Sequence, residues 1–358
     1  MNDSKLKVLV VGCGNMGYSH ALAYHKIEDF EICGLVSRPQ DSKRRGEVAK
    51  EFGVVNEFDD YYIALKETKP DVVSINTYPD SHAEYAMAAL DADCHVFVEK
   101  PLASTVEDAI AIVQKAALAK RKVVVGYILR HHPTWKKFVE LSHTLGKPLV
   151  IRMNLNQQSF GKNWETHKGL MSSISPIVDC GVHYVDMMCL MTRSRPIRVQ
   201  AIGARLSDEL KPDMYNYGQL QVVFEDDSVG WYEAGWGPMV SETAHFIKDV
   251  FGPDGAVSFV KDASKESSDA VDSHVQTEKL LVHHSQIGAD GKFARADELI
   301  DVVDEPDHYD LCRFEQEYLL RAIREDIDLS QHLEDVVNSL RIVLAADESI
   351  RKKKTIDL

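Results

Sequence analysis

Residues 5 to 126 alternate short, continuous apolar runs with longer stretches in which apolar positions recur at helical spacing. Five segments are short, continuous apolar runs: KVLVVG, FEICGLV, DVVSIN, HVFVEK and KVVVGY. The stretches between them, such as SHALAYHKI and AEYAMAALDA, are amphipathic as helices. Continuous apolar strands separated by helices are typical of a parallel sheet that is covered on both faces. This part of the chain therefore predicts a doubly wound α/β domain.

The pattern changes after residue 128. Residues 147–159, 196–205, 216–225 and 228–236 alternate apolar and polar positions, and FEDDSVGW supplies a hairpin turn between the last two. Helical patterns at about 308–325 and 332–349 close the chain, and the polar stretch 261–273 predicts a mobile surface loop. We predict two domains, 1–128 and 129–358. The second is an α+β domain with a large, mostly antiparallel open sheet that helices cover on one face.

Composition and charge limit the class of ligand. Hydrophobic residues make up 44% of the 358 positions and charged residues 27%, as in ordinary globular proteins. No run of 18 apolar residues predicts a membrane helix, and the start MNDSKLKVLVVG lacks a secretory cleavage site. The net charge of −15 opposes binding to a phosphate backbone, so we expect a small-molecule ligand, no nucleic acid and no membrane. Six cysteines without CxxC spacing indicate reduced thiols, and we expect a cytoplasmic location.

The first apolar run leads directly into GCGNMG, which contains Gly12, Gly14 and Gly17. Glycines can mark any tight turn, but this motif follows a predicted strand and begins a predicted helix. In that setting the glycines provide the turn, the close approach of the backbone to a pyrophosphate and the close packing of the helix. The helix N-terminus adds positive potential. The motif therefore predicts a dinucleotide-binding Rossmann domain.

The end of the second apolar run bears on the choice of cofactor. An NAD site usually presents Asp or Glu to the adenosine ribose at this place, whereas this chain continues as VSRPQDSKRR. Ser37 can donate to a 2′-phosphate, Arg38 can form a bidentate pair with it, and Lys43 adds charge nearby. The sequence favours NADP(H). NAD(H) stays possible if Arg38 stacks on the adenine ring instead.

A carboxylate and an ammonium group end the buried run in HVFVEKPLA, residues 95–103. Buried charges are costly unless they are paired, so Glu99 and Lys100 need a reason to be there. Doubly wound sheets open their ligand crevice at the carboxyl ends of the strands, which would place both charges at a cleft. The alternative is a surface ion pair between Glu99 and Lys100.

Five motifs occur in order between residues 12 and 186: GCGNMG, NTYPDSH, EKP, GYILR and DCGVHYVD. Together they resemble the glucose–fructose oxidoreductase, inositol dehydrogenase and rhizopine-catabolism (Gfo/Idh/MocA) oxidoreductases. The resemblance implies that Lys100 lies beside the nicotinamide and contacts the reacting hydroxyl, and that the peptide before Pro101 is often cis. The cofactor contacts expected from the motifs are Gly12, Gly14, Asn15, Met16, Gly17, Ser37, Arg38, Thr77, His82, Glu99, Lys100 and Pro101.

The chain departs from the family pattern in two places. Tyr78 stands where relatives often have the proline of T-P-N-x-x-H, although His82 keeps its place at the predicted helix start. Ser173, Ile174 and Ser175 replace the glycine run that usually precedes D-x-G-x-H. The second departure leaves the floor of the substrate pocket without a prediction.

DCGVHYVD supplies a candidate acid–base pair. Asp179 and His183 are four residues apart, so on a helix their Cβ atoms would stand roughly 6 Å apart on one face. An imidazole can take the hydroxyl proton as hydride leaves, and a neighbouring carboxylate stabilises the imidazolium. The resemblance assigns catalysis to Lys100, Asp179 and His183, while the residues alone also allow a helix N-cap for Asp179 and a core position for His183. A metal site that adds Asp186 is disfavoured because no second His or Cys has ligand spacing, and we expect no metal.

Three further side chains are candidates for contacts with the substrate, beside Lys100, Asp179 and His183. Arg130 follows the last apolar run of the first domain and would meet a hydroxyl-rich or anionic group. Trp164 and His167 lie in GKNWETHKG, and aromatic faces suit the C–H face of a sugar ring. Trp236, at the end of a predicted strand, is equally compatible with a core position.

These observations predict an NAD(P)-dependent dehydrogenase or reductase that transfers hydride between nicotinamide and a secondary alcohol or ketone of a sugar, an inositol or a related polyol. Two alternatives stay open: an NAD-retaining, redox-assisted glycoside-cleaving enzyme of the same fold, and a non-catalytic nucleotide-sensing regulator. The regulator is disfavoured because Lys100, Asp179 and His183 are all present. The resemblance also implies a homodimer or homotetramer that forms through the sheet of the second domain.

Overall fold

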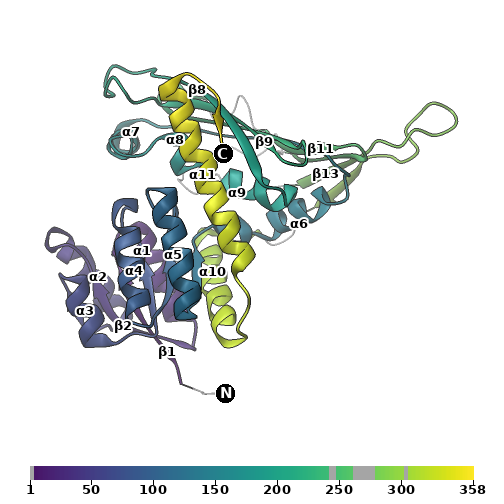
Figure 1. Ribbon diagram of the computed structural model, residues 1–358. Helices are drawn as coiled ribbons and strands as arrows, with labels where there is room; N and C mark the ends of the chain where they lie inside the picture. Colours follow the sequence, from purple (N-terminus) through teal and green to yellow (C-terminus); the bar gives the residue numbers. More distant parts are fainter. Residues whose placement is uncertain (1–3, 242–246, 261–278, 302–304) are drawn as a thin grey trace. The chain divides into compact units, whose positions relative to one another are not determined.

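The computed structural model describes residues 4–241, 247–260, 279–301 and 305–358. These residues form two compact units (Figure 1). The first unit contains residues 1–131 and 306–337, and the second contains 132–305 and 338–358. The sequence suggested one boundary, after residue 128, whereas the chain returns to the first unit near its end. The predicted loop at 261–273 lies outside the described residues.

The first unit contains a six-stranded parallel sheet with the order β3-β2-β1-β4-β5-β6. This order is that of a Rossmann fold, as predicted. The five apolar runs form its long strands, and the two-residue β3 was not predicted. The strands are β1 (Leu6–Val11), β2 (Phe30–Val36), β3 (Glu57–Phe58), β4 (Val72–Ile75), β5 (His95–Val98) and β6 (Val123–Val125).

Helices connect these strands and bury their apolar faces against the sheet. They are α1 (Asn15–Lys26), α2 (Ser42–Phe52), α3 (Tyr61–Thr68), α4 (His82–Asp91) and α5 (Val106–Ala119), with short 3₁₀ turns at Pro39–Asp41, Pro79–Ser81 and Ile128–Arg130. A sixth helix, α10 (His308–Arg324), joins the same core, where Leu319 and Ala322 are buried in one cluster with Tyr24 of α1 and Phe97 of β5. Apolar packing therefore ties a late segment of the chain to the first helix.

The second unit is built on a nine-stranded sheet with the order β14-β13-β12-β11-β7-β10-β9-β8-β15. Neighbouring strands are antiparallel except β7 and β10, which confirms a mostly antiparallel sheet. The strands are β7 (Val150–Gln158), β8 (Pro196–Ala204), β9 (Tyr217–Phe224), β10 (Val229–Gly237), β11 (Lys248–Gly252), β12 (Gly255–Val260), β13 (Lys279–His284), β14 (Glu298–Asp301) and β15 (Ile356–Asp357).

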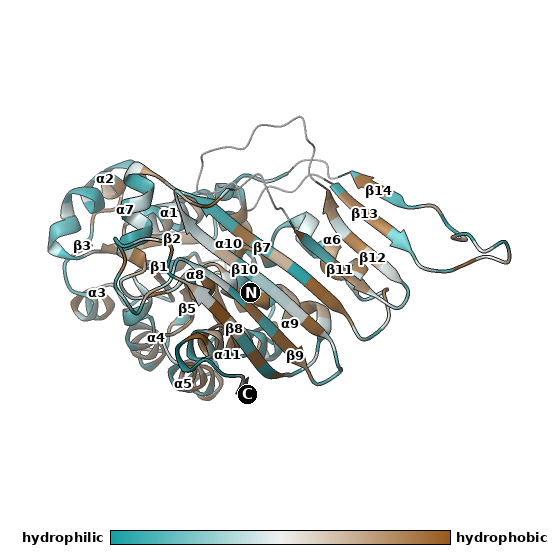
Figure 2. Ribbon diagram, turned by 90° about the horizontal axis from the view of Figure 1, so that it is seen from above, coloured by the Kyte–Doolittle hydropathy of each residue, from teal (hydrophilic) through white to brown (hydrophobic). Residues whose placement is uncertain are grey.

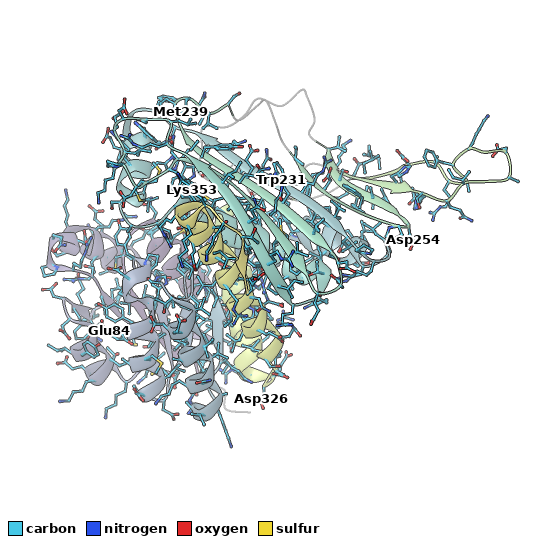
Figure 3. The ribbon with its side chains drawn as sticks, turned by 45° about the horizontal axis from the view of Figure 1, so that its top comes forward. Glu84, Trp231, Met239, Asp254, Asp326 and Lys353 are labelled. Atoms are coloured by element: carbon cyan, nitrogen blue, oxygen red, sulfur yellow. The ribbon has the colours of Figure 1, made fainter. Side chains whose placement is uncertain are left out.

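Helices cover one face of this sheet, and none of the described helices lies on the other, which we call the open face (Figure 2). Tyr232 of β10 stacks on Tyr184, and Phe259 of β12 contacts Trp135. Trp231 precedes Tyr232 on β10, and its side chain stands on the opposite, open face of the sheet (Figure 3). The covering helices are α6 (Pro133–Ser142), α8 (Pro176–Asp179), α9 (Gly181–Thr192) and the last part of α11 (Ser330–Lys352), while α7 (Gly161–Leu170) lies against β10. None of the described helices is both long and apolar enough to cross a membrane.

Candidate active site

Of the three glycines after β1, Gly12 and Gly17 are required by close backbone contacts, whereas Gly14 is not. Gly12 has φ +91°, and a Cβ there would lie 2.5 Å from the carbonyl oxygen of Asn76. A Cβ on Gly17 would lie 1.8 Å from the carbonyl oxygen of Gly12. A Cβ on Gly14 would meet nothing within 4 Å among the described residues, and Gly14 precedes α1 without a side-chain cap. The open Gly14 backbone at an uncapped helix start fits a dinucleotide pyrophosphate.

Two arginines, Arg38 and Arg45, lie near the end of β2, and both pair with carboxylates. The exposed Arg38 donates from Nε to Asp41 at 2.9 Å, and its guanidinium lies 5.9 Å from the ring centre of Tyr78. The hydroxyl of Ser37 donates to the carbonyl of Arg38 and accepts from the buried Arg45. Sequence reasoning missed Arg45, although SKRRGEVAKEF places it on the inward face of an amphipathic helix. The contacts of Ser37 and Arg38 with a 2′-phosphate stay a prediction.

His82 connects the loop after β4 to the loop after β5. Its Nδ1 lies 2.7 Å from the carbonyl oxygen of Pro101, and its Nε2 lies 3.0 Å from that of Thr77. Burial lowers the pKa of His82, and a neutral ring donates one N–H to one of the two carbonyls. Thr77 also shares a hydrogen bond with Ser81 at 2.6 Å. His82 therefore fixes the shape of two loops that the motifs assign to the cofactor.

At the end of β5, Glu99 is buried, whereas Lys100 is half-buried. The Glu99 carboxylate is buried, accepts from Nε2 of His20 at 2.6 Å and accepts from the backbone N–H of Lys100 at 3.1 Å. Burial raises the pKa of Glu99, but the bond from His20 and the charge of Lys100 outweigh it and hold this pKa below its usual value. Sequence reasoning missed His20, whose only signal was its place three residues after Gly17. The Lys100–Pro101 peptide is cis.

Arg130 is bound within the first unit. Its guanidinium lies 2.9 Å from Nδ1 of His332 and 3.6 Å from the carboxylate of Asp335, and it stands over the ring of Tyr127. His332 and Asp335 belong to the first turns of α11. These contacts account for the burial of Arg130, and its contact with substrate stays a prediction.

In the second unit, Asp179 and His183 lie at the junction of α8 and α9. Asp179 ends α8 and Gly181 begins α9, with Cys180 between them in a helical conformation. His183 is buried, and Asp179 is half-buried. The N-cap of α8 is Ser175, whose hydroxyl accepts from Val178, so Asp179 is not the cap. The chain is thus nearly continuous as a helix across the predicted pair.

The predicted residue His167 lies close to Asp179. Its ring stacks on Trp236 with centroids 4.4 Å apart, and its Nδ1 lies 2.9 Å from the hydroxyl of Ser159. Burial lowers the pKa of His167, and the negative charge of Asp179 partly opposes this. Trp236 donates to Gln157 at 2.7 Å. The predicted Trp164 belongs to the same buried cluster, which consists of Trp164, Met171, Cys180, Leu210 and Trp236.

A carboxylate late in the chain holds the start of α8, and sequence reasoning did not identify it. Asp347 of α11 accepts from the hydroxyl of Ser175 at 2.8 Å and from the hydroxyl of Tyr215. Burial raises the pKa of Asp347, although both hydrogen bonds oppose this. Ser175 belongs to the stretch where the resemblance led us to expect glycines, and its side chain anchors the helix that ends in Asp179.

Two family models match the chain. Residues 6–127 match the model described as an oxidoreductase family with an NAD-binding Rossmann fold, and residues 135–256 match the GFO/IDH/MocA C-terminal domain. The chain belongs to the Gfo/Idh/MocA family. The first match contains the whole six-stranded sheet, and the second contains most of the nine-stranded sheet. The matches confirm the resemblance that the five motifs indicated.

Curated relatives include sugar and inositol dehydrogenases. Inositol 2-dehydrogenase from Paracoccus denitrificans is 27% identical over 190 residues, which are 51% of this chain and 53% of the relative. The NAD(+)-dependent scyllo-inositol 2-dehydrogenase from Bacillus subtilis is 25% identical over 266 residues, 71% of this chain and 74% of that one. The first alignment thus spans about half the length of the relative.

Solved structures share the fold over almost the whole chain. Scyllo-inositol dehydrogenase from Lactobacillus casei, solved with NAD(H) and scyllo-inositol, superimposes with a TM-score of 0.76 at 20% identity and covers 99% of both chains. An oxidoreductase from Agrobacterium radiobacter, solved with NAD+, L-tartaric acid and magnesium, gives a TM-score of 0.77 at 18% identity, covering 99% of this chain and 98% of that one. At these identities the likeness concerns the fold.

Proposed function

We propose that this protein is an NAD(P)-dependent dehydrogenase or reductase that acts on a secondary alcohol or ketone of a sugar, an inositol or a related polyol. The proposal rests on the arrangement of residues at the carboxyl ends of the strands in the first unit's sheet. There the backbone of Gly14 is open at the uncapped start of α1, and Glu99 fixes the backbone of Lys100 at the end of β5. Membership of an NAD-binding oxidoreductase family and the inositol dehydrogenase relatives support the same reaction class.

Each catalytic role follows from side-chain chemistry. The Lys100 ammonium would hold and polarise the reacting oxygen, since a positioned cation stabilises negative charge that develops there. His183 would accept the hydroxyl proton as the C–H bond loses its hydride and the carbonyl forms, and Asp179 would stabilise the imidazolium. A bound nicotinamide would supply the hydride acceptor. Arg130, Trp164 and His167 are proposed to contact the substrate.

We further propose a preference for NADP(H) over NAD(H), because Ser37 and Arg38 replace the acidic residue expected at the end of β2. The exposed guanidinium of Arg38 is compatible with a phosphate partner. We also propose that the protein assembles as a homodimer or homotetramer through the open face of the nine-stranded sheet.

A substrate panel tests the reaction class. Polyols, inositols and keto-sugars are offered with NADP(H) and with NAD(H), while the absorbance of reduced nicotinamide is followed. A dehydrogenase changes this absorbance in proportion to substrate turnover. Cleavage of a glycoside without a net change would show the redox-assisted glycoside-cleaving enzyme, and cofactor binding without turnover of any compound would favour the regulator.

Lys100→Met tests the role of the ammonium group. We expect kcat to fall by roughly 10²–10³, as for the loss of a positioned oxyanion donor, while the cofactor still binds. Lys115→Met is the matched control, because Lys115 lies on the surface of α5 and pairs with Asp91. An unchanged kcat in Lys100→Met would show that the ammonium group does not act on the reacting oxygen.

A further inference from the structure

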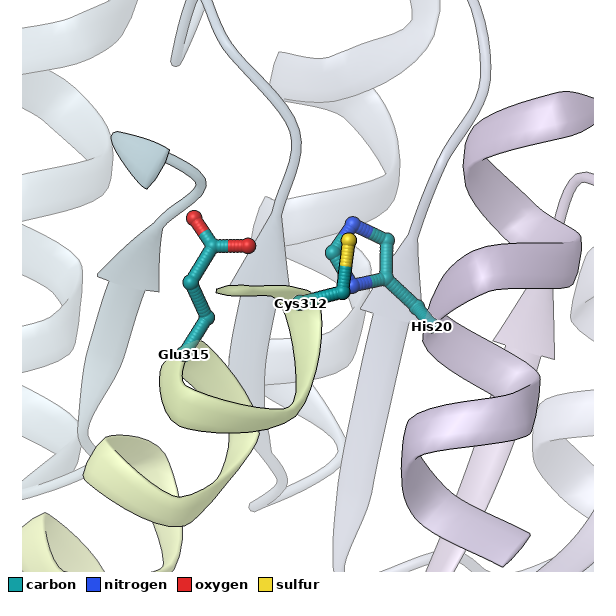
Figure 4. A group of neighbouring side chains, drawn as sticks. All are labelled: His20, Cys312 and Glu315. Atoms are coloured by element: carbon teal, nitrogen blue, oxygen red, sulfur yellow. The ribbon is translucent and has the colours of Figure 1, made fainter. Parts of the chain in front are cut away.

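One face of α10 brings three potential metal ligands together. His308, Cys312 and Glu315 follow one another at spacings of four and three residues, which places them along one stripe of a helix. This stripe faces His20 of α1 (Figure 4). One ligand atom from each of His20, Cys312 and Glu315 lies within 4.8 Å of the other two, and all three residues are buried.

One carboxyl oxygen of the buried Glu315 has no hydrogen-bond partner in the described part of the chain. Glu315 is 1% exposed, and its Oε1 has no hydrogen-bond partner among the described residues. The amide oxygen of the neighbouring Gln316 is also buried and unpartnered within the described part of the chain. A second buried carboxylate, Glu99, stands close enough to act on Glu315 electrostatically. An ionised buried carboxylate is costly without a donor or a cation, and a cation bound here would supply the partner that Oε1 of Glu315 lacks among the described residues.

The orientation of His20 matches that of a metal ligand. Its Nε2 donates to Glu99 at 2.6 Å, and Nδ1 accepts from the amide of Gln316 at 3.0 Å. Ligand histidines commonly donate their second N–H to a carboxylate, which fixes the ring and raises its basicity. Glu99 fills that role here. A cation bound at Nδ1 would take the place of the Gln316 amide.

We propose that His20, Cys312 and Glu315 bind a divalent cation of the zinc type. Imidazole, thiolate and carboxylate are all zinc ligands, and the thiolate disfavours magnesium and calcium. Ligand atoms of a tetrahedral zinc site stand roughly 3.3–3.8 Å apart, so the side chains would close by about 1 Å around the ion. Nε2 of His308, which lies 3.6 Å from Sγ of Cys312, is a candidate for the fourth position.

The ion would have a structural effect within the first unit. It would join α1 to α10, fix the ring of His20 and thereby hold Glu99, which accepts from the N–H of Lys100. The proposal does not depend on the hydride-transfer function, because metal binding is measured without substrate or nicotinamide.

Zinc titration of the full chain tests the site. Metal is first removed with a chelator, and zinc binding is then followed by calorimetry and by metal analysis after desalting. We expect one zinc per chain, with binding weakened more than about 100-fold in Cys312→Ser and in Glu315→Gln because each removes a direct ligand. Cys94→Ser is the matched control, since Cys94 is equally buried but bonds to the carbonyl of Pro70.

Two results of the zinc titration would overturn the proposal. One is no zinc binding at micromolar concentration, and the other is binding that survives both ligand variants. Cobalt(II) provides a readout on the unmodified chain in case a variant does not fold: coordination by Cys312 gives a thiolate-to-cobalt charge-transfer band. A cobalt complex without that band would also exclude the site. Glu99→Gln should weaken zinc binding by about 10–100-fold, as expected when the carboxylate behind a ligand histidine is lost.

Discussion

Glu99 and Lys100 are neighbours in the chain but have opposite surroundings. Glu99 is enclosed by His20, by the N–H of Lys100 and by Gly126, where a Cβ would lie 3.3 Å from the Glu99 carboxylate. Lys100 is only half-buried. A buried acid that anchors the backbone and a cation that extends from it explain why two charges end a buried strand. The surface ion pair considered from the sequence does not describe this arrangement, because Glu99 is 7% exposed.

Arg38 and Asp41 together allow a test of the cofactor preference. Arg38→Ala should raise the KM for NADP more than about tenfold and leave that for NAD nearly unchanged, since a charge-assisted bond is worth roughly 1.5–3 kcal/mol. Asp41→Asn should lower the KM for NADP, because Asp41 now accepts from Nε of Arg38. Initial rates with both cofactors measure this. Equal losses for NADP and NAD in Arg38→Ala would show that Arg38 packs on adenine.

The acid–base role of His183 predicts a pH dependence. A base must be deprotonated to accept a proton, so kcat/KM for alcohol oxidation should rise with pH through the range where an imidazole titrates. His183→Ala should lower the rate by roughly 10²–10⁴ and flatten this rise, and Asp179→Asn should keep the fold but weaken the base.

The control for this series is His283→Gln, because His283 lies on β13 and pairs with Asp297. It should keep both rate and pH profile. Circular dichroism confirms that each variant is folded. A His183→Ala protein with an unchanged rate and profile would show that another group takes the proton, and His167, which stands near Asp179, would be tested next.

At the scale of elements, the turn from β1 into α1 contains one glycine that folding requires and another that we assign to cofactor binding. Gly17→Ala should destabilise the first unit strongly, because the new Cβ would collide with the carbonyl of Gly12. Gly14→Ala should leave the melting temperature nearly unchanged, since its Cβ has open space, but weaken cofactor binding where the backbone approaches the pyrophosphate. Thermal melts with and without cofactor distinguish the two variants. Normal cofactor affinity in Gly14→Ala would contradict the assignment of this turn.

The start of β5 carries a pH-sensitive contribution to stability. Burial, reinforced by the charges of Arg121 and Lys122, lowers the pKa of His95 to about 4, while Asp71 and Asp93 oppose this. Between pH 6.5 and 4 the unfolded state therefore binds more protons than the folded state. The neutral His95 therefore makes its full contribution to the free energy of unfolding above pH 6.5. As the pH falls to 4, the free energy of unfolding decreases by about 1–2 kcal/mol, after allowance for solvent screening.

His95→Gln tests this dependence. Glutamine does not titrate and can still accept from the N–H of Lys122, which now donates to Nδ1 of His95 at 2.9 Å. Denaturant unfolding at several pH values should show a smaller loss of stability toward pH 4 in the variant. If the free energy of unfolding falls equally with pH in the two proteins, groups other than His95 cause the acid sensitivity.

Elements with a continuous apolar or strongly amphipathic pattern could be predicted, because burial alone determines those patterns. The five apolar runs became the long strands of the first sheet, and 308–325 and 332–349 became α10 and α11. The two-residue β3 and β15 and the strands β11 to β14 were not predicted, since short or irregular pairings leave little local signal. Motif spacing could likewise identify Gly12, Gly14 and Gly17, but not the carboxylate of Asp347 that anchors α8.

At the scale of the whole molecule, contacts between distant parts of the chain were beyond sequence reasoning. His20 meets Cys312 and Gln316 across almost the entire sequence, and Arg130 meets His332. No local spacing indicates such pairs, which explains why we expected a single domain boundary. The return of 306–337 to the first unit follows from the apolar face of α10, whose partner only the folded chain reveals.

The open face of the nine-stranded sheet leads to the last prediction. It carries Trp231 of β10, Phe251 of β11 and the 59% exposed Ile202 of β8 among polar neighbours. Large apolar side chains on an otherwise polar sheet face are typical of a protein–protein interface. If this face joins identical subunits, each side chain is repeated across the symmetry axis, so one substitution alters the interface twice.

Light scattering coupled to size exclusion measures the assembly. We expect a dimer or tetramer for the unmodified chain and a smaller species for the double variant Trp231→Glu, Ile202→Glu, because it places unpaired carboxylates in a desolvated interface. Leu118→Glu is the matched control, since Leu118 is 83% exposed on α5 of the first unit. It should leave the mass unchanged. A monomeric unmodified chain, or a double variant that keeps its mass, would show that this face does not hold subunits together.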